Sequence, residues 1–404
     1  MPPVPEPPSR AAASPWPLWT VVFVVAFGTN VPTPLLLVYR ETLGLDATAL
    51  TGAFAIYAAG LVPALLLAGP ASDRLGRRRV VVPFVVLSVV TSLLFLGAGS
   101  SVALLYVGRF LQGAVSGVVF SVGTAWLGEL VGHPGRSARL TTAALGAGWA
   151  LGPLVSGLLA QWLRPPSLAS TVVPYLVHVA LMAVGLVLLV RIPETLPPQR
   201  RRVGGPLLNL GVPPAARRPF TLVVLPVAIA VFTFPSTAVT VLPLLLTPAM
   251  PGIAVAVTGL TAGVTLLTGV FAQPLERRLG AVRAGPAGIA IGAAGFALSL
   301  VGAAVHAWPV LVPVAVLLGT GYGLCLAAGL TTVAWLAPPT ERGALTGTFY
   351  ACAYLGFGVP VLLSVATGPA GFTEPLAVLA VVVVVVAGVL MLPAARRLVA
   401  PVTV

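Results

Sequence analysis

The sequence predicts an all-α integral membrane protein, with twelve transmembrane helices in two pseudo-symmetric six-helix bundles. Three observations predict this fold class. Of the 404 residues, 58% are hydrophobic and only 8% are charged, and the mean hydropathy is +1.05. Apolar runs of about 20 residues, the length that crosses a bilayer, follow one another with short connectors. Motifs of the first half recur in the second. Because soluble domains contain roughly 25% charged residues, this composition excludes a soluble enzyme.

Each expected span is an apolar run bounded by Pro, Gly or charged residues. The first follows a Pro- and Ala-rich tail without a small-residue cleavage site, so it is interpreted as a helix and not as a signal peptide. Pro and Gly inside later spans are tolerated because neighbouring helices satisfy the freed backbone groups. In order, the expected spans are Trp16–Tyr39, Ala49–Gly69, Val80–Gly99, Val102–Val131, Leu140–Leu163, Thr171–Ile192, Phe220–Thr247, Ile253–Leu275, Val282–Val305, Trp308–Ala337, Leu345–Thr367 and Pro375–Pro393.

The longest connector divides the spans into six and six. It is rich in Pro and Arg and shows no sustained periodicity, which is typical of a linker. The expected parts are a disordered cytoplasmic N-terminal tail (1–15), an N-terminal bundle (16–192), a cytoplasmic linker (193–219), a C-terminal bundle (220–393) and a cytoplasmic tail (394–404).

Arginine placement predicts the orientation. All but three of the 22 basic residues, which are all Arg, fall in segments that are cytoplasmic if the N-terminus is inside. The exceptions are Arg40, Arg109 and Arg164. This bias predicts a multi-pass protein of the plasma membrane with both termini in the cytoplasm. It also accounts for the net charge of +13 without a nucleic-acid partner.

The two halves contain related sequences. Ala125-Trp126-Leu127 leads through a short Arg-bearing loop into the fifth span, and Ala334-Trp335-Leu336 leads in the same way into the eleventh. The connectors after the second and eighth spans are both Arg-rich. Duplicated six-helix units are typical of secondary transporters, whose substrate site lies between the halves near the membrane midplane.

The clearest motif lies at the end of the second span. It matches the pattern G-x-x-x-D-R-x-G-R-R with Gly69, Asp73, Arg74, Gly76, Arg77 and Arg78. On this motif the chain resembles the major facilitator superfamily, closest to its drug/proton antiporter-like members, over essentially its whole length. The resemblance implies a gate that joins the two halves on the cytoplasmic side in the outward-open state. Glu129 is the expected acidic partner of Arg77 or Arg78, the alternative being a solvated carboxylate at a helix end.

A second motif, Arg109-Phe-Leu-Gln112-Gly113, resembles the R-x-x-Q-G element of the family. Arg109, Gln112 and Ser116 share one helix face. The resemblance implies that Arg109 and Gln112 act in proton coupling or gating, and the alternative is an Arg that snorkels to the interface. His178 is the third coupling candidate, because it is the one mid-span group that ordinarily titrates near neutrality. Its alternative role is a hydrogen-bonded packing residue.

A third motif lies in the fifth span and contains Gly148, Gly152, Pro153 and Gly157. It is similar to the antiporter pattern G-x-x-x-G-P-x-x-G-G, which implies export by exchange. Ser156 replaces one Gly, and Arg139 stands where a more distant Gly is usual. The alternative is a small-residue face that only packs helices.

The resemblance also implies that the first, fourth, seventh and tenth spans line the substrate cavity. The expected lining is apolar, aromatic or weakly polar, which suits a lipophilic or amphipathic molecule. No Asp or Glu lies near the middle of a span, so no carboxylate there is available to carry protons. The candidates, with one from the eleventh span, are Asn30, Thr33, Gln112, Ser116, Phe234, Ser236, Tyr322 and Tyr354.

The sequence therefore predicts a transporter that works by alternating access and exports small hydrophobic or amphipathic molecules in exchange for protons. It predicts a monomer in the lipid bilayer, with no enzyme activity, cofactor or metal site, because His, Cys and acidic residues show no ligand spacing. One alternative is uptake or facilitated diffusion of a small metabolite by the same fold. The alternative of another class is a transport-dead membrane sensor, which a disrupted gate motif or an extra soluble domain would favour.

Overall fold

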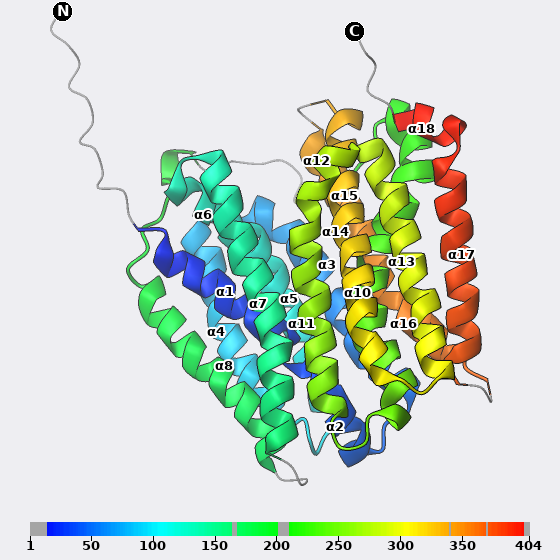
Figure 1. Ribbon diagram of the computed structural model, residues 1–404. Helices are drawn as coiled ribbons and strands as arrows, with labels where there is room; N and C mark the ends of the chain where they lie inside the picture. Colours follow the sequence, from blue (N-terminus) through cyan, green and yellow to red (C-terminus); the bar gives the residue numbers. More distant parts are fainter. Residues whose placement is uncertain (1–13, 164–167, 201–209, 339–340, 369–370, 400–404) are drawn as a thin grey trace, which may run out of the picture.

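The computed structural model describes residues 14–163, 168–200, 210–338, 341–368 and 371–399. Within these residues, twelve helical segments are long and apolar enough to cross a membrane. The expected number of spans is therefore confirmed. The segments stand side by side in two groups, with most of the blue-to-green first half on the left of Figure 1 and the green-to-red second half on the right.

The first half is built from helices that in places continue into one another. The helix of the first span is interrupted at Val31, before Pro32, because Pro cannot donate a backbone hydrogen bond. The fourth span contains a π-helical turn, η1, which shifts the residues that follow it around the helix. The elements are α1 (Trp16–Asn30), α2 (Pro32–Leu43), α3 (Ala47–Leu75), α4 (Arg77–Phe95), α5 (Val102–Val118), η1 (Val119–Gly123), α6 (Thr124–Val131), α7 (Pro134–Trp162) and α8 (Leu168–Leu189).

The second half has the same plan, and a 3-10 turn, η8, lies inside the eleventh span of the chain. The elements are α9 (Arg217–Pro219), η4 (Phe220–Val224), α10 (Leu225–Leu246), α11 (Ala254–Ala272), η6 (Gln273–Leu275), α12 (Glu276–Leu279), α13 (Ala281–Ala304), α14 (Leu311–Leu336), α15 (Arg342–Tyr354), η8 (Leu355–Gly358), α16 (Val359–Val365), α17 (Thr373–Met391) and α18 (Pro393–Val399). Short 3-10 turns are η2 (Pro198–Arg200), η3 (Pro214–Ala216), η5 (Thr247–Ala249) and η7 (Trp308–Val310).

Some element boundaries differ from those expected. Helical structure at the seventh span begins at Pro214, inside the expected linker, because η3, α9 and η4 lead directly into α10. The expected C-terminal tail contains α18, whose Val399 is buried. Residues 1–15 are expected to be disordered, and of these, 1–13 lie outside the described residues. The same holds for residues 201–209 of the linker and 400–404 of the tail.

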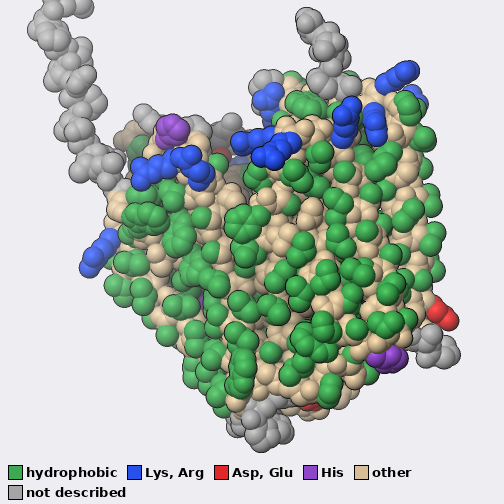
Figure 2. Space-filling model, in the orientation of Figure 1, with side chains coloured by type: hydrophobic (Ala, Val, Ile, Leu, Met, Phe, Trp, Pro, Cys, Tyr) green, Lys and Arg blue, Asp and Glu red, His purple; other side chains and the backbone are tan. Residues whose placement is uncertain are grey.

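The bundle has two distinct ends. Helix α1 begins and α18 ends at the same end, which is called the terminal end below; the turn between α2 and α3 lies at the opposite, far end (Figure 1). Figure 2 shows Arg side chains gathered along the rim of the terminal end, above a mostly apolar belt. This distribution agrees with the arginine bias on which the predicted orientation depends.

One tight turn is repeated in the two halves. Gly76 joins α3 to α4 with φ of 102°, and Gly280 joins α12 to α13 with φ of 74°. Only glycine adopts such a φ without strain, so the sequence permits this turn at both places. The shared conformation supports the duplicated plan of the chain.

The two halves meet along α7 and α11, and also where α2 approaches α11 and α3 approaches α16. Near the far end, the hydroxyls of Thr51 and Ser364 are 2.9 Å apart, which joins α3 to α16. The Ala256 amide donates to Gln161 Oε1 at 3.3 Å, and Gln161 Nε2 donates to the Gly252 carbonyl. These hydrogen bonds close the far end of the interface.

Candidate functional site

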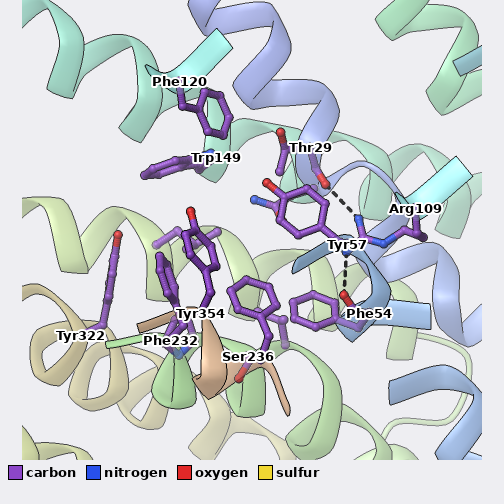
Figure 3. Close-up of a pocket in the computed structure, with 15 residues that line it drawn as sticks. Thr29, Phe54, Tyr57, Arg109, Phe120, Trp149, Phe232, Ser236, Tyr322 and Tyr354 are labelled. Carbon is purple, nitrogen blue, oxygen red and sulfur yellow. Dashed lines mark hydrogen bonds between the residues drawn. The ribbon is translucent and has the colours of Figure 1, made fainter. Parts of the chain in front are cut away.

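A cavity of about 60 Å³ lies between the two halves, near the middle of the bundle. Helices of both halves contribute side chains to it, as Figure 3 shows. Eight of its fifteen lining residues are aromatic, and Arg109 is the one charged residue among them. The lining residues are Thr29, Asn30, Phe54, Tyr57, Arg109, Phe120, Trp149, Phe232, Pro235, Ser236, Val239, Leu266, Tyr322, Tyr354 and Phe357.

Aromatic rings pack against one another across the cavity. Phe54 of α3 stacks on Phe357 of η8, with centroids 5.1 Å apart, and this pair joins the two halves. Phe232 stacks on Tyr354 at 4.5 Å within the second half. Stacked and edge-on pairs of this kind add about 0.5–1.5 kcal/mol to the free energy gained from burial. The walls are therefore both apolar and held in place.

Arg109 lies on α5 and is only 1% exposed. Its Nε donates to the Ala53 carbonyl at 3.1 Å, Nη1 donates to the Thr29 carbonyl at 3.2 Å, and Nη2 donates to the Phe54 carbonyl at 3.3 Å. Nη1 also donates to Gln112 Oε1 at 2.6 Å. Four hydrogen bonds thus tie the guanidinium to α1, α3 and its own helix, which does not fit an Arg that snorkels to the interface.

The charge of Arg109 is balanced without a carboxylate. No acidic side chain of the described residues forms an ion pair with it, and the guanidinium carbon lies 4.8 Å from the Tyr57 ring centroid and 5.3 Å from that of Phe54. Carbonyl oxygens and π faces take the place of a counter-ion. A buried cation is costly unless it is compensated, and in membrane segments such residues usually mark functional sites.

Gln112 and Ser116 support Arg109 and are not among the residues that line the cavity. Gln112 Nε2 donates to the Gly28 carbonyl at 2.6 Å, while its Oε1 receives the bond from Arg109. The Ser116 and Thr29 hydroxyls are 2.9 Å apart. These contacts fix α5 against α1 beside the cavity.

The other expected cavity residues divide into two groups. Asn30, Ser236, Tyr322 and Tyr354 line the cavity. Thr33 lines a smaller void of about 10 Å³ between α2, α3, α10 and α11.

The expectation for Phe234 is wrong. Its ring is fully buried, packs on Phe296 at a centroid distance of 5.7 Å, and fills space that a side chain at Gly292 would occupy. The physical reason is the helical period of α10, on which Phe232, Ser236 and Val239 face the cavity. Phe234 therefore lies on another face of that helix.

His178 is buried between α8, α1 and α4 and is not among the residues that line the cavity. Its Nε2 is 3.2 Å from the Val24 carbonyl, which only accepts, so Nε2 carries the hydrogen and donates. Nδ1 then accepts from the Ser92 hydroxyl at 2.7 Å. The ring also stacks on Phe27. This is the geometry of a hydrogen-bonded packing residue.

At the terminal end, Arg77 joins three elements. Its Nη1 lies 2.7 Å from Asp73 Oδ1, and its Nη2 lies 2.8 Å from Glu129 Oε1. The other Glu129 oxygen accepts from the Thr195 hydroxyl. Arg77 is thus the arginine that Glu129 contacts, whereas Arg78 donates to the Ile192 carbonyl at 3.0 Å. These contacts lie within the first half and the start of the linker, so a gate that joins the halves stays a prediction for another state.

Glu194 has a role that was not expected. Its two carboxylate oxygens accept from the backbone amides of Arg77 and Arg78, at 3.1 and 3.0 Å. These amides open α4, and the first amides of a helix have no partner inside it. A negative charge there also interacts favourably with the helix dipole. The sequence shows only that an acidic residue directly follows the sixth span. That this residue lies at the start of α4 becomes visible only in the fold.

Replacing Glu194 by Ala is expected to cost about 1 kcal/mol of local stability at the start of α4, the usual value of a helix cap. Hydrogen exchange of the first-turn amides should then accelerate about fivefold. Glu194→Gln, which keeps one acceptor oxygen, should show a smaller effect. Unchanged exchange in Glu194→Ala would show that these amides do not depend on the carboxylate.

The glycines of the α7 motif lie at two close helix contacts, one with α1 and one with α11. A Cβ atom on Gly148 would lie 2.5 Å from the Phe23 carbonyl oxygen of α1, and one on Gly152 would clash with the Phe27 carbonyl. A Cβ on Gly157 would lie 2.9 Å from the Val255 carbonyl oxygen of α11. The Pro153 carbonyl likewise approaches Gly259 of α11. The motif thus permits close packing both within the first half and across the interface.

Comparison with known proteins shows which family model the chain matches and which solved structures share its fold. The family model for the Major Facilitator Superfamily matches residues 18–360. The multidrug resistance protein MdtL of Escherichia coli O157:H7 is 36% identical over 89 residues, which are 22% of this chain and 22% of that protein. The chain thus aligns with about a fifth of the length of these curated relatives.

Two solved structures have the same fold at low sequence identity. A POT family transporter, solved in complex with 5-aminolevulinic acid, is 14% identical with a TM-score of 0.76, covering 93% of this chain and 95% of that chain. The nucleoside transporter NupG is 13% identical with a TM-score of 0.71, covering 94% of this chain and 98% of that chain.

Proposed function

Because the chain belongs to the major facilitator superfamily, whose family model matches residues 18–360, we propose that this transporter exports small hydrophobic or amphipathic molecules in exchange for protons. The observation that carries the proposal is the cavity between the halves, with aromatic walls contributed by both. Sites for lipophilic molecules are typically lined in this way, with a few polar groups that orient the ligand.

The size of the cavity supports a mechanism in which the halves move. Its volume of about 60 Å³ is well below the roughly 300–1,000 Å³ of sites for drug-sized molecules. Rocking one half against the other would separate Phe54 and Tyr57 of α3 from Phe357 of η8 and widen the cavity. We therefore interpret the structure as a state with little room for substrate, closed at its far end by the hydrogen bonds between the halves.

Two observations favour export over uptake. The motif with Gly148, Gly152 and Pro153 resembles the antiporter pattern, and its glycines lie at close helix contacts. The partial relative MdtL is named a multidrug resistance protein. Exchange for protons is proposed on the resemblance to antiporters alone, because neither His178 nor any acid of the described residues lines the cavity.

The proposal predicts that Asp73→Asn lowers transport about tenfold or more while the amount of folded protein stays the same. Asp73 is partly exposed, and exposed ion pairs contribute only about 0–1 kcal/mol to stability. Its expected role is in switching between states, so the rate should fall without loss of fold. Normal flux in this variant would remove Asp73 from the gate, and Glu276→Gln is a matched control at a partly exposed acid of the terminal end.

The direct test uses everted membrane vesicles from cells with and without the protein. Three fluorescent lipophilic dyes, one positive, one neutral and one negative, are followed after an acid-inside proton gradient is imposed. Export predicts that at least one dye accumulates in vesicles that contain the protein, and that a protonophore abolishes the accumulation. Dye entry driven by the opposite gradient would instead support uptake.

A further inference from the structure

The central cavity has a net positive charge. Arg109 lines it, and none of the acidic residues that the structure describes does. The nine acids of the chain lie at the ends of the expected spans or outside them. Inside a site that excludes water, a single charge acts strongly on a ligand because screening is weak. A cationic ligand would therefore be repelled and an anionic one attracted.

The cavity also presents hydrogen-bond donors that have no partner among the described residues. A guanidinium has five N–H groups, and four of those of Arg109 are bonded to protein oxygens, which leaves one. The Trp149 indole N–H, which can only donate, has no acceptor among the described residues. The Tyr322 and Tyr354 hydroxyls have no partner there either, and Figure 3 shows both on the cavity side of their rings.

The remaining polar groups of the cavity are largely occupied. The Ser236 hydroxyl lies 3.1 Å from the Gly356 carbonyl, to which it donates. The Thr29 hydroxyl lies 2.9 Å from the Val25 carbonyl and 2.9 Å from the Ser116 hydroxyl. A ligand would thus find unused donors and a positive charge, between aromatic faces.

We propose that this transporter selects aromatic molecules that carry acceptor oxygens and are neutral or singly negative. It discriminates against lipophilic cations. This inference rests on the proposed function. A carboxylate or phenolate would lie beside Arg109 and accept its free N–H. The rings of Phe232 and Tyr354 would stack on the aromatic part. The indole and tyrosine donors would bind further carbonyl or ether oxygens.

The experiment measures equilibrium binding to the purified full-length protein by isothermal titration calorimetry. Three ligands share one ring system and differ in charge: 2-naphthoate, 2-naphthamide and 2-naphthylmethylammonium. Wild-type protein is expected to bind the carboxylate at least about tenfold more tightly than the ammonium, with the amide between them, as one favourable and one unfavourable charge contact imply. Equal affinities, tighter binding of the ammonium, or binding of none of the three would overturn the proposal.

Variants assign the selectivity to named groups. Arg109→Gln should weaken binding of the carboxylate about threefold or more, to the level of the amide, and should not weaken binding of the ammonium. Tyr354→Phe, which keeps the ring, should weaken the carboxylate and the amide about threefold. Arg40→Gln, at an exposed arginine outside this cavity, should leave all three affinities unchanged. Selectivity that survives in Arg109→Gln would show that the guanidinium does not set it.

The result of the binding experiment does not depend on the direction of transport. If the carboxylate binds preferentially but energised vesicles accumulate no dye, the export proposal fails and the ligand selectivity stands. If vesicles export a dye but the ammonium binds as tightly as the carboxylate, export stands and the ligand selectivity fails.

Discussion

Arg109→Gln is expected to lower the transport rate at least about fiftyfold, which corresponds to roughly 2.3 kcal/mol, while the protein still inserts and folds. The guanidinium links the Thr29 carbonyl of α1 to the Ala53 and Phe54 carbonyls of α3. Gln is shorter and uncharged, so it cannot reach all three. The link between α1 and α3 on the first-half side of the cavity would then be lost. The measurement is the initial rate of counterflow of 2-naphthamide in proteoliposomes.

A neutral substrate separates this effect from ligand binding. Binding of 2-naphthamide to Arg109→Gln should change by less than about threefold, because no charge contact is lost. Arg109→Lys is the matched control: it keeps the charge but cannot make the same four hydrogen bonds, so an intermediate rate is expected. An unchanged rate in Arg109→Gln, at equal protein amounts, would show that the contacts of this residue are structural only.

Gly152→Ala is expected to lower the free energy of unfolding by about 2–3 kcal/mol, the range for adding atoms to a closely packed contact. A methyl group at this position would clash with the Phe27 carbonyl of α1. The clash involves backbone, so α1 and α7 must separate along their length. The measurement is the fraction of purified protein that remains monodisperse in size-exclusion chromatography after heating.

Gly388→Ala provides the matched control. Gly388 also lies inside a transmembrane helix, α17, but no atom lies within 4 Å of the place that a Cβ would take. Because Ala favours helix more than Gly does, by about 1 kcal/mol, this variant should be at least as stable as wild type. Equal stability of the two variants would mean that the α1–α7 contact tolerates separation and that the close approach is not needed for folding.

The fold could be predicted from the sequence because the bilayer imposes simple rules on it. Span length and the Gly76 turn are local properties, and each span shows them within its own residues. The boundary at Pro214 could not be predicted in this way. Pro and Arg there are typical of a linker, whereas in the structure the segment continues into α10 and contacts α14 and α18.

The site could be predicted only in part. Arg109 and Tyr322 lie on spans that the family resemblance places at the cavity, but Phe54, Phe120 and Phe357 come from three separate elements. Their meeting depends on the rotation of the halves and on the π-helical turn at Val119–Gly123, which turns Phe120 toward Trp149. The hydrophobic periodicity of a single span shows neither the rotation of the halves nor the π-helical turn. The same limit applies to Phe234, which the sequence places at the cavity but which packs on Phe296.

The lack of a counter-ion at Arg109 has an electrical consequence. With a singly negative ligand bound, the centre of the protein is neutral when it changes its access. After the ligand leaves, the returning protein would carry the formal positive charge of Arg109 together with the proton taken in exchange. Moving one charge across a membrane at 100 mV involves about 2.3 kcal/mol, so voltage would act on this positively charged return step and not on the neutral loaded step.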